Sequence, residues 1–71
     1  MNRIREFREE AQLSQVRLGI LSQIPSSMIS DFELGKRAPW PKARRALARA
    51  LSGAIGHKVS EADLFPNGKE A

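Results

Sequence analysis

The chain contains no cysteine and no tyrosine, and it has only one histidine, His57, and one tryptophan, Trp40. The lack of cysteine excludes a disulfide framework and a thiolate metal site, and one histidine cannot form a metal cluster. There is no nucleophile paired with a base and no phosphate-binding glycine loop, and 71 residues can hardly enclose a catalytic pocket. We therefore expect no enzyme activity and no cofactor, with His57 in a surface loop.

Long apolar runs are also absent. The apolar stretches are only a few residues long, and charged Arg3 and Arg5 follow Met1 almost at once. This is unlike a signal peptide or a membrane span. A content of 41% hydrophobic and 28% charged residues is typical of a globular chain rather than a disordered one. We expect one soluble, cytoplasmic domain that is stabilised by packed apolar side chains.

Acidic residues are missing from one segment. Residues 36–51 contain six lysines and arginines and no acid, whereas residues 1–35 contain four arginines and five acids. The net charge of +4 therefore has one main source. Clustered basic residues gain affinity for polyanions by releasing counterions from phosphates, but they are also common on solvated helix faces. The charge pattern alone fits both interpretations about equally.

Apolar periodicity, helix caps and breakers predict five short helices and no strand. We expect one all-α domain over residues 1–66 and a frayed C-terminal tail over residues 67–71. The predicted helices are 2–11 with Asn2 as cap, one starting at Gln15 with Ser14 as cap and stopping around Ser22, about 25–34 between Pro25 and Gly35, about 41–52, and a short one after Ser60 that contains Leu64 and Phe65.

Three glycines carry further expectations. Gly53 and Gly56 are predicted to bracket a looser segment after the fourth helix. Gly19 lies inside the second helix, where it costs roughly 1 kcal/mol of helix propensity relative to alanine.

The second and third helices, with the basic segment after them, fit the geometry by which a helix enters the DNA major groove. The segment SQVRLGILSQIPSSMISDFELGKRAPW (14–40) carries an SQ opening, an LG pair and an ELGKRAP ending. In these motifs it resembles the lambda-repressor-like, Xre/Cro-type helix-turn-helix regulators of bacteria and phages. A weaker resemblance extends over residues 4–65. It implies a five-helix DNA-binding domain with the helix-turn-helix at helices two and three.

The chain departs from the family at two turns. The family commonly has glycine where this chain has Gln12, after the first helix, and Gln23, between the second and third. Because a non-glycine residue at positive φ is uncommon, we expect turn strain or an altered turn at these positions.

The resemblance places base contacts on the outward side of the third helix. Serine can donate or accept, aspartate can accept from cytosine N4, and a methionine methyl can touch thymine. Capping of free backbone donors explains Ser26 or Ser27 nearly as well. Because no long bidentate donor is present, we expect little direct readout and more readout of DNA shape. The base-contact candidates are Ser26, Ser27, Met28, Ser30 and Asp31.

Phosphate contacts are implied at the start of the second helix and after the third. Gln15 resembles a residue that clamps a phosphate; the alternative is that it is only a solvent-exposed first residue of the helix. Arg44, Arg45 and Arg49 cannot all face one surface, because a helix turns about 100 degrees per residue. The phosphate-contact candidates are Ser14, Gln15, Lys36, Arg37 and Lys42.

Arg8 and Glu33 are implied to form a buried structural salt bridge between helices one and three. Trp40 is expected to cover the edge of the core, with stacking on a deoxyribose or on a partner subunit as the alternative.

These patterns together predict a sequence-specific transcriptional regulator, a repressor of phage, prophage or mobile-element type, that binds double-stranded DNA. We expect a homodimer on a pseudo-palindromic operator. The alternative is an antitoxin or anti-repressor that uses the same fold mainly to bind a protein, which an exposed apolar patch around Trp40 or Phe65 would favour. Candidates for the two-fold interface, with core packing as an equal alternative, are Ile55, Val59, Leu64 and Phe65.

Overall fold

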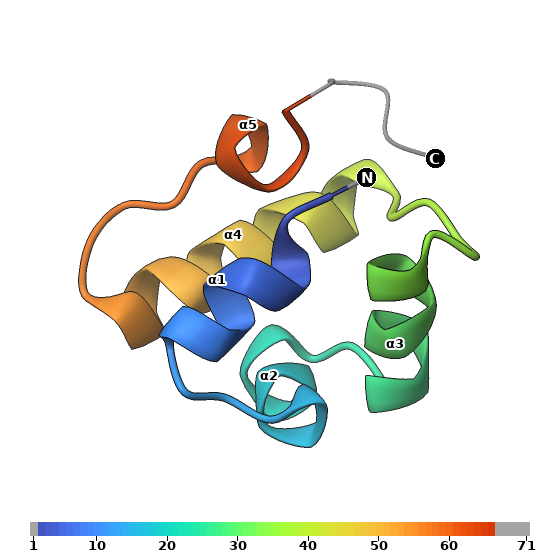
Figure 1. Cartoon of the computed structure of the whole chain (residues 1–71), viewed down its shortest axis with the longest axis horizontal. Helices are drawn as coiled ribbons and strands as arrows, with labels where there is room; N and C mark the ends of the chain where they lie inside the picture. Colours follow the sequence, from blue (N-terminus) through green and yellow to red (C-terminus); the bar gives the residue numbers. More distant parts are fainter. Residues whose placement is uncertain (1, 67–71) are drawn as a thin grey trace.

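The computed structural model describes residues 2–66, and within this range it contains five α-helices and no strand. The predicted all-α fold class is therefore confirmed, whereas the predicted tail over 67–71 lies outside the described residues. No helix within residues 2–66 has the length and apolar character needed to cross a membrane. The helices are α1 (Ile4–Glu10), α2 (Gln15–Ser22), α3 (Ser26–Leu34), α4 (Pro41–Ile55) and α5 (Glu61–Leu64) (Figure 1).

Two of the helices, α2 and α5, start at serine caps. Ser14 Oγ accepts a hydrogen bond from the Arg17 backbone nitrogen at 3.0 Å, which caps α2. Ser60 and Asp63 form a reciprocal capping box at α5, in which each side chain accepts from the other residue's backbone nitrogen. The hydrogen bonds from Ser60 hold the pKa of the Asp63 carboxyl below its ordinary value.

Asn2 links the start of the chain to α3. Its side-chain oxygen accepts from the Ile4 backbone nitrogen at 3.1 Å, which satisfies a free donor of α1. Its amide nitrogen donates to the Phe32 carbonyl oxygen at 2.7 Å. Nearby, the Arg3 backbone nitrogen donates to the Leu64 carbonyl oxygen at 2.8 Å, so the same segment also holds α5.

The fourth helix is longer than the sequence indicates. It ends at Ile55 instead of near residue 52, and Gly53 lies inside it rather than opening a looser segment. Ile55 packs partly against the core, which explains why the helix continues through a residue of low helix propensity. Gly56 caps the C-terminus of the helix, and its φ of 93° belongs to the left-handed region that glycine tolerates.

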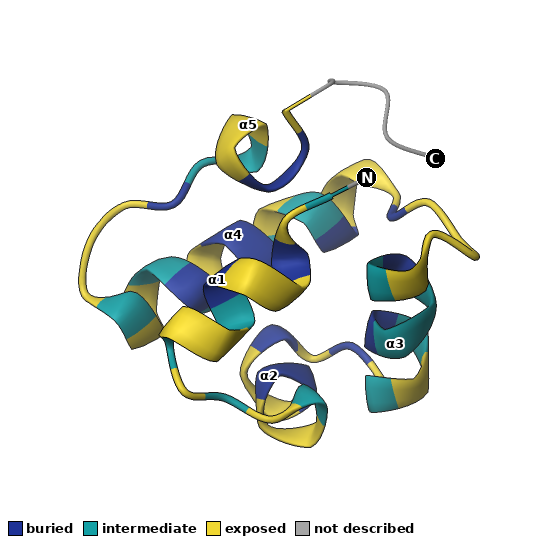
Figure 2. Ribbon diagram, in the orientation of Figure 1, coloured by how far each residue is buried: buried dark blue, intermediate teal, exposed yellow. Residues whose placement is uncertain are grey.

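The core forms around α4, which packs against α1, α2 and α5, while α3 packs against α1 and α2. The helices turn their buried sides inward and leave polar sides exposed, as Figure 2 shows. The largest fully buried side chains are Ile4, Leu18, Ile29, Phe32, Leu47, Leu51 and Leu64.

The C-terminal apolar residues belong to this core. Val59, Leu64 and Phe65 are no more than 3% exposed, so they cannot form the surface of a two-fold interface. For these three residues the structure shows the core packing that was the equal alternative to a dimer interface. Ile55 is only partly buried against the core.

Gln12 and Gln23, the two residues at which turn strain was expected, both adopt left-handed backbone conformations. The φ angles of Gln12 and Gln23 are 60° and 61°, so the expected positive φ is present at both turns. The Ile24 backbone nitrogen donates back to the Gly19 carbonyl oxygen at 3.0 Å, which closes the turn after α2.

This close turn explains why position 19 is occupied by glycine. A Cβ atom at this position would lie 2.6 Å from the Ile24 carbonyl oxygen and 3.4 Å from the Ser26 backbone nitrogen. Real contacts of a Cβ atom are essentially never as short as the first of these distances. The cost in helix propensity is therefore a consequence of packing the α2–α3 turn directly on α2.

Candidate nucleic-acid interface

A buried ion pair joins α1 to the end of α3. Arg8 Nε donates to Glu33 Oε2 at 2.7 Å and Arg8 Nη2 donates to Glu33 Oε1 at 3.2 Å, a bidentate arrangement. The two side chains are only 12% and 4% exposed. The hydrogen bond to Glu33 raises the pKa of Arg8 above its ordinary value. The structure thus brings together the pair that the resemblance assigned to a structural role.

Gln15 extends this cluster to the first residue of α2. Its Nε2 donates to Glu33 Oε1 at 3.1 Å, while Arg8 Nη1 donates to the Leu13 carbonyl oxygen at 2.9 Å. The start of α2 is therefore fixed beside the end of α3. This second role of Gln15 was not predicted, because a glutamine next to a helix cap carries no signal for a partner 18 residues away.

The predicted phosphate contacts at the start of α2 are thus partly occupied within the protein. Gln15 retains one N–H of its amide, and Ser14 retains the hydrogen of its hydroxyl, whose oxygen already accepts from Arg17. Both groups sit at the N-terminus of α2, where backbone N–H groups favour an anion.

The outward side of α3 presents small polar groups. Ser27 is exposed, and Ser26, Ser30 and Asp31 are partly exposed. Within residues 2–66 the three hydroxyls form no hydrogen bond, so the capping alternative for Ser26 and Ser27 is not what the structure shows. Met28 packs partly against the core, which leaves less of its side chain for an external contact.

The end of α3 sets the direction of the loop that carries Lys36 and Arg37, here called the basic loop. The Lys36 backbone nitrogen donates to the Asp31 carbonyl oxygen at 2.9 Å, and that of Gly35 donates to the Phe32 carbonyl oxygen at 3.2 Å. This is a Schellman motif, and Gly35 adopts the φ of 76° that it requires. Lys36 and Arg37 follow it and are exposed. Arg37 Nε lies 3.9 Å from Asp31 Oδ2, a loose surface ion pair.

The arginines of α4 separate onto different sides, as the helical rotation requires. The Arg44 guanidinium lies over the Phe65 ring, 5.1 Å from its centroid, and its Nε is buried without a hydrogen-bond partner. Arg45 and Arg49 are exposed. Lys42, which precedes them, is also exposed.

Trp40 packs on the core edge and remains partly open to solvent. Its ring meets the Phe32 ring edge-on, with centroids 5.8 Å apart at an interplanar angle of 74°. The residue is nevertheless 44% exposed. His57 is exposed, and its Nε2 lies 3.8 Å from Glu10 Oε2.

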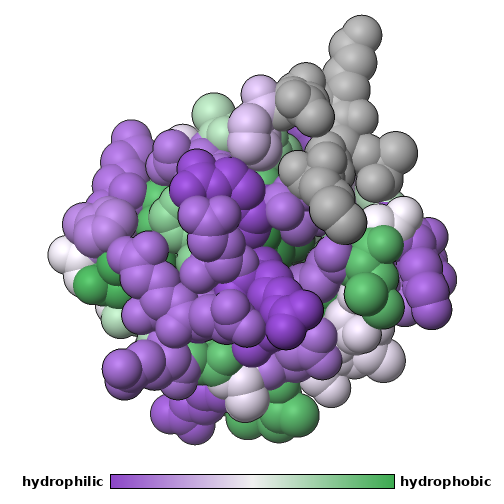
Figure 3. Space-filling model, viewed as in Figure 1, coloured by the Kyte–Doolittle hydropathy of each residue, from purple (hydrophilic) through white to green (hydrophobic). Residues whose placement is uncertain are grey.

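Hydrophilic side chains cover most of the face seen in Figure 3, with separate apolar groups near its edges.

Comparisons with family models, with curated proteins and with solved structures found no match for this chain. Among the described residues, no group of three or more histidine and carboxylate side chains could hold a metal ion.

Proposed function

We propose that this protein binds double-stranded DNA as a small transcriptional repressor, with α2 and α3 acting as a lambda-repressor-like helix-turn-helix. The observation that carries the proposal is the polar side of α3, which lies between the N-terminus of α2 and the basic residues Lys36 and Arg37. The Gln15–Glu33 contact holds the N-terminus of α2 beside the end of α3, and Lys36 and Arg37 follow that end directly. A recognition helix flanked by phosphate-binding groups has this arrangement.

In this proposal α3 enters the major groove, which is about 12 Å wide and accepts one helix. The hydroxyls of Ser26, Ser27 and Ser30 are not engaged within the described part of the chain, so they can donate to or accept from base edges. Asp31 can accept from cytosine N4. These side chains are short, so shape and deformability of the DNA supply much of the sequence preference.

Phosphate groups are held on both sides of α3. Lys36, Arg37 and Lys42 supply positive charge, while Ser14 and Gln15 supply the remaining N–H and O–H donors and the helix N-terminus. Neutralising phosphates releases counterions, so the affinity falls steeply as salt rises.

The protein acts as a homodimer on a pseudo-palindromic operator, with half-sites about 34 Å apart. The two-fold contact cannot use Val59, Leu64 or Phe65, because the monomer core already buries them. Of the original candidates, Ile55 alone keeps part of its surface.

Selection of bound duplexes from a random DNA pool tests this proposal. The expected result is an enriched motif with two-fold symmetry, bound by the purified full chain with an affinity that decreases as salt increases. A pool that shows no enrichment, together with no salt-dependent binding to any duplex, would overturn the proposal.

Binding of a protein partner, as in an antitoxin or anti-repressor, is a second candidate function. One observation favours it: Trp40 is 44% exposed at the end of an open, partly apolar groove along α4. Phe65 offers no such patch, because it is buried.

A further inference from the structure

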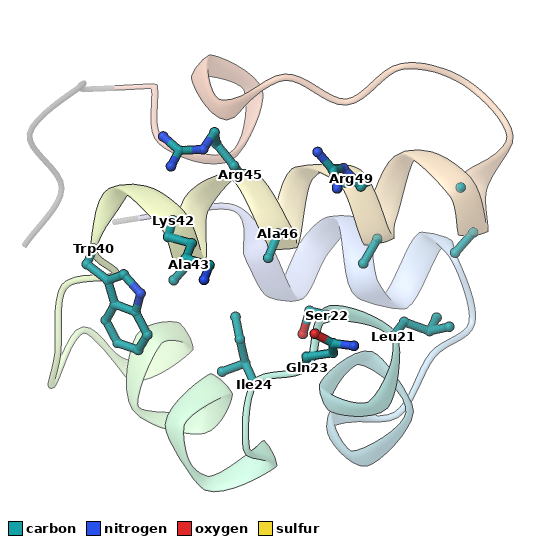
Figure 4. Close-up of a pocket in the computed structure, with 13 residues that line it drawn as sticks. Leu21, Ser22, Gln23, Ile24, Trp40, Lys42, Ala43, Arg45, Ala46 and Arg49 are labelled. Carbon is teal, nitrogen blue, oxygen red and sulfur yellow. The ribbon is translucent and has the colours of Figure 1, made fainter.

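An open groove runs along α4 on the side that faces the C-terminal end of α2 (Figure 4). Its volume is about 970 Å³. Ile24, from the α2–α3 turn, and Ala46 of α4 lie at its floor, and Leu21 and Trp40 stand at its two ends. Leu21 and Trp40 are 46% and 44% exposed, so the two apolar ends of the groove are open to solvent.

The charge of the lining has one sign. Lys42, Arg45 and Arg49 border the groove, and no acidic residue lines it. Their i, i+3 and i+7 spacing places them along one edge of α4, and Figure 4 shows Arg45 and Arg49 on the edge remote from α2. None of the three forms an ion pair with a carboxylate of residues 2–66. An apolar floor therefore lies beside a positive edge that pairs with no carboxylate of residues 2–66.

The shape of the groove suits a helix. From Trp40 to Ala54 it follows α4 for 14 residues, which at a rise of about 1.5 Å per residue is roughly 20 Å. Apart from Lys42, Arg45 and Arg49 at its edge, the α4 residues that line the groove are small, and small residues allow two helix axes to approach to about 8 Å. They are Ala43, Ala46, Ala50, Gly53 and Ala54.

Two other occupants fit less well. A second copy of this chain offers few free carboxylates on α1, because Glu6 pairs with Arg3 at 2.7 Å and Glu9 pairs with Arg5 at 3.1 Å. A nucleic-acid backbone matches the positive edge, but it is dominated by phosphates, and its sugars offer only a small apolar surface to Leu21 and the floor beside it.

We propose that the α2–α4 groove docks an acidic amphipathic helix of a partner protein, with its apolar side on the floor and its carboxylates on Arg45 and Arg49. This is helix-in-groove recognition, in which apolar anchors supply affinity and charges supply orientation and on-rate. Gln23 and Ile24 line the groove and also form the turn that precedes α3. A docked helix thus contacts the element that positions α3. The proposal does not depend on DNA binding.

The full chain and a synthetic peptide provide the test. The probe is an amphipathic peptide of about four helical turns with leucines on one side and glutamates beside them, and the matched peptide has lysine in place of each glutamate. Trp40, the only tryptophan in the sequence, reports on the groove through its fluorescence. We expect the glutamate peptide to shift the Trp40 emission saturably and the lysine peptide to bind at least about tenfold more weakly.

A charge-reversal variant makes the test specific. We expect Arg45→Glu with Arg49→Glu to weaken the glutamate peptide about tenfold and to strengthen the lysine peptide. Lys58→Glu, an exposed change outside the groove, should leave both affinities unchanged. Circular dichroism checks that each variant is folded.

Three results would overturn the docking proposal. They are a glutamate peptide that leaves Trp40 emission unchanged at millimolar concentration, equal binding of the two peptides, and an unchanged peptide preference in the folded double variant. Loss of DNA binding in that variant without a change in peptide affinity would assign Arg45 and Arg49 to nucleic acid and would also overturn it. None of these peptide results bears on whether α3 binds DNA.

Discussion

Two regions of this molecule carry similar positive charge but differ in the side chains that surround it. Lys36 and Arg37 follow α3, whose outward side presents serine hydroxyls. Arg45 and Arg49 lie along α4, beside an open groove with an apolar floor. A sequence count of positive residues treats both regions as one basic segment.

The difference shows that the groups next to a positive charge, rather than the charge itself, indicate its partner. Hydroxyls and a helix N-terminus beside lysine and arginine match phosphates and base edges. Exposed leucine and tryptophan beside arginine match an amphipathic protein surface. Substitutions that affect both regions can therefore be distinguished from substitutions that affect only one.

The largest effect is expected from Glu33→Ala, because it leaves Arg8 buried without its partner. Breaking such a pair costs about 3 to 5 kcal/mol, which approaches the whole stability of a small domain. Urea unfolding measures this loss, and both basic regions should lose their binding together. The matched control replaces Arg8 and Glu33 by Met and Leu, which should recover most of the stability. A single variant within about 1 kcal/mol of the parent would contradict the structural role of this pair.

Gly19→Ala tests the turn that both regions share. Alanine gains about 1 kcal/mol of helix propensity, but its Cβ would meet the Ile24 carbonyl oxygen at 2.6 Å. Because overpacking costs about 1 to 3 kcal/mol, we expect a net loss of stability in thermal or urea unfolding. Gly53→Ala is the control, since no atom lies within 4 Å of its added Cβ, and it should stabilise the protein by roughly 0.5 to 1 kcal/mol. A stabilised Gly19→Ala variant would show that the turn can move away from α2.

The fold was largely predictable because its signals are local. Ser14, Ser60, Pro25 and Gly35 mark helix ends through backbone geometry and hydrogen bonds that span only a few residues. The end of α4 was not predictable, because packing of Ile55 on the core extends the helix past Gly53. The need for glycine at position 19 also depends on a tertiary approach that helix propensity does not contain.

The candidate site divides in the same way. The outward positions of α3 follow from helical periodicity, so their exposure could be predicted. The hydrogen bond from Gln15 to Glu33 depends on where α2 and α3 meet, which helical periodicity does not predict. The choice between core and dimer interface for Val59 and Phe65 needed the position of α5, because an apolar residue near a chain end fits both.

Asp31→Asn should affect the α3 region alone. The change removes a negative charge from the proposed DNA surface and releases Arg37, which lies 3.9 Å from Asp31. We expect affinity for random duplex DNA to rise about two- to fivefold, as measured by fluorescence anisotropy. Peptide binding at the α4 groove should not change. Unaltered affinity for random DNA would place Asp31 away from the phosphates.

The smallest effect is expected at the α5 capping box, which lies in neither region. The pKa of Asp63 is lowered in the folded protein, so its contribution to stability is complete above the ordinary aspartate pKa of about 3.9. This contribution is lost as the pH falls through the lower folded pKa. Thermal unfolding between neutral and acidic pH should therefore show a slightly smaller acid loss in Asp63→Ala than in the parent. Identical pH profiles would show that the carboxylate adds nothing to the cap.

The salt dependence of DNA affinity in the double variant Lys36→Ala, Arg37→Ala tests the central claim most directly. Binding is measured by anisotropy over a range of salt concentrations on selected and random duplexes, with Lys58→Ala as the matched control. We predict weaker binding on all sequences and a slope of log affinity against log salt that is smaller by about two. An unchanged affinity and an unchanged slope in the folded double variant would contradict the claim that α3 and its basic loop dock on DNA.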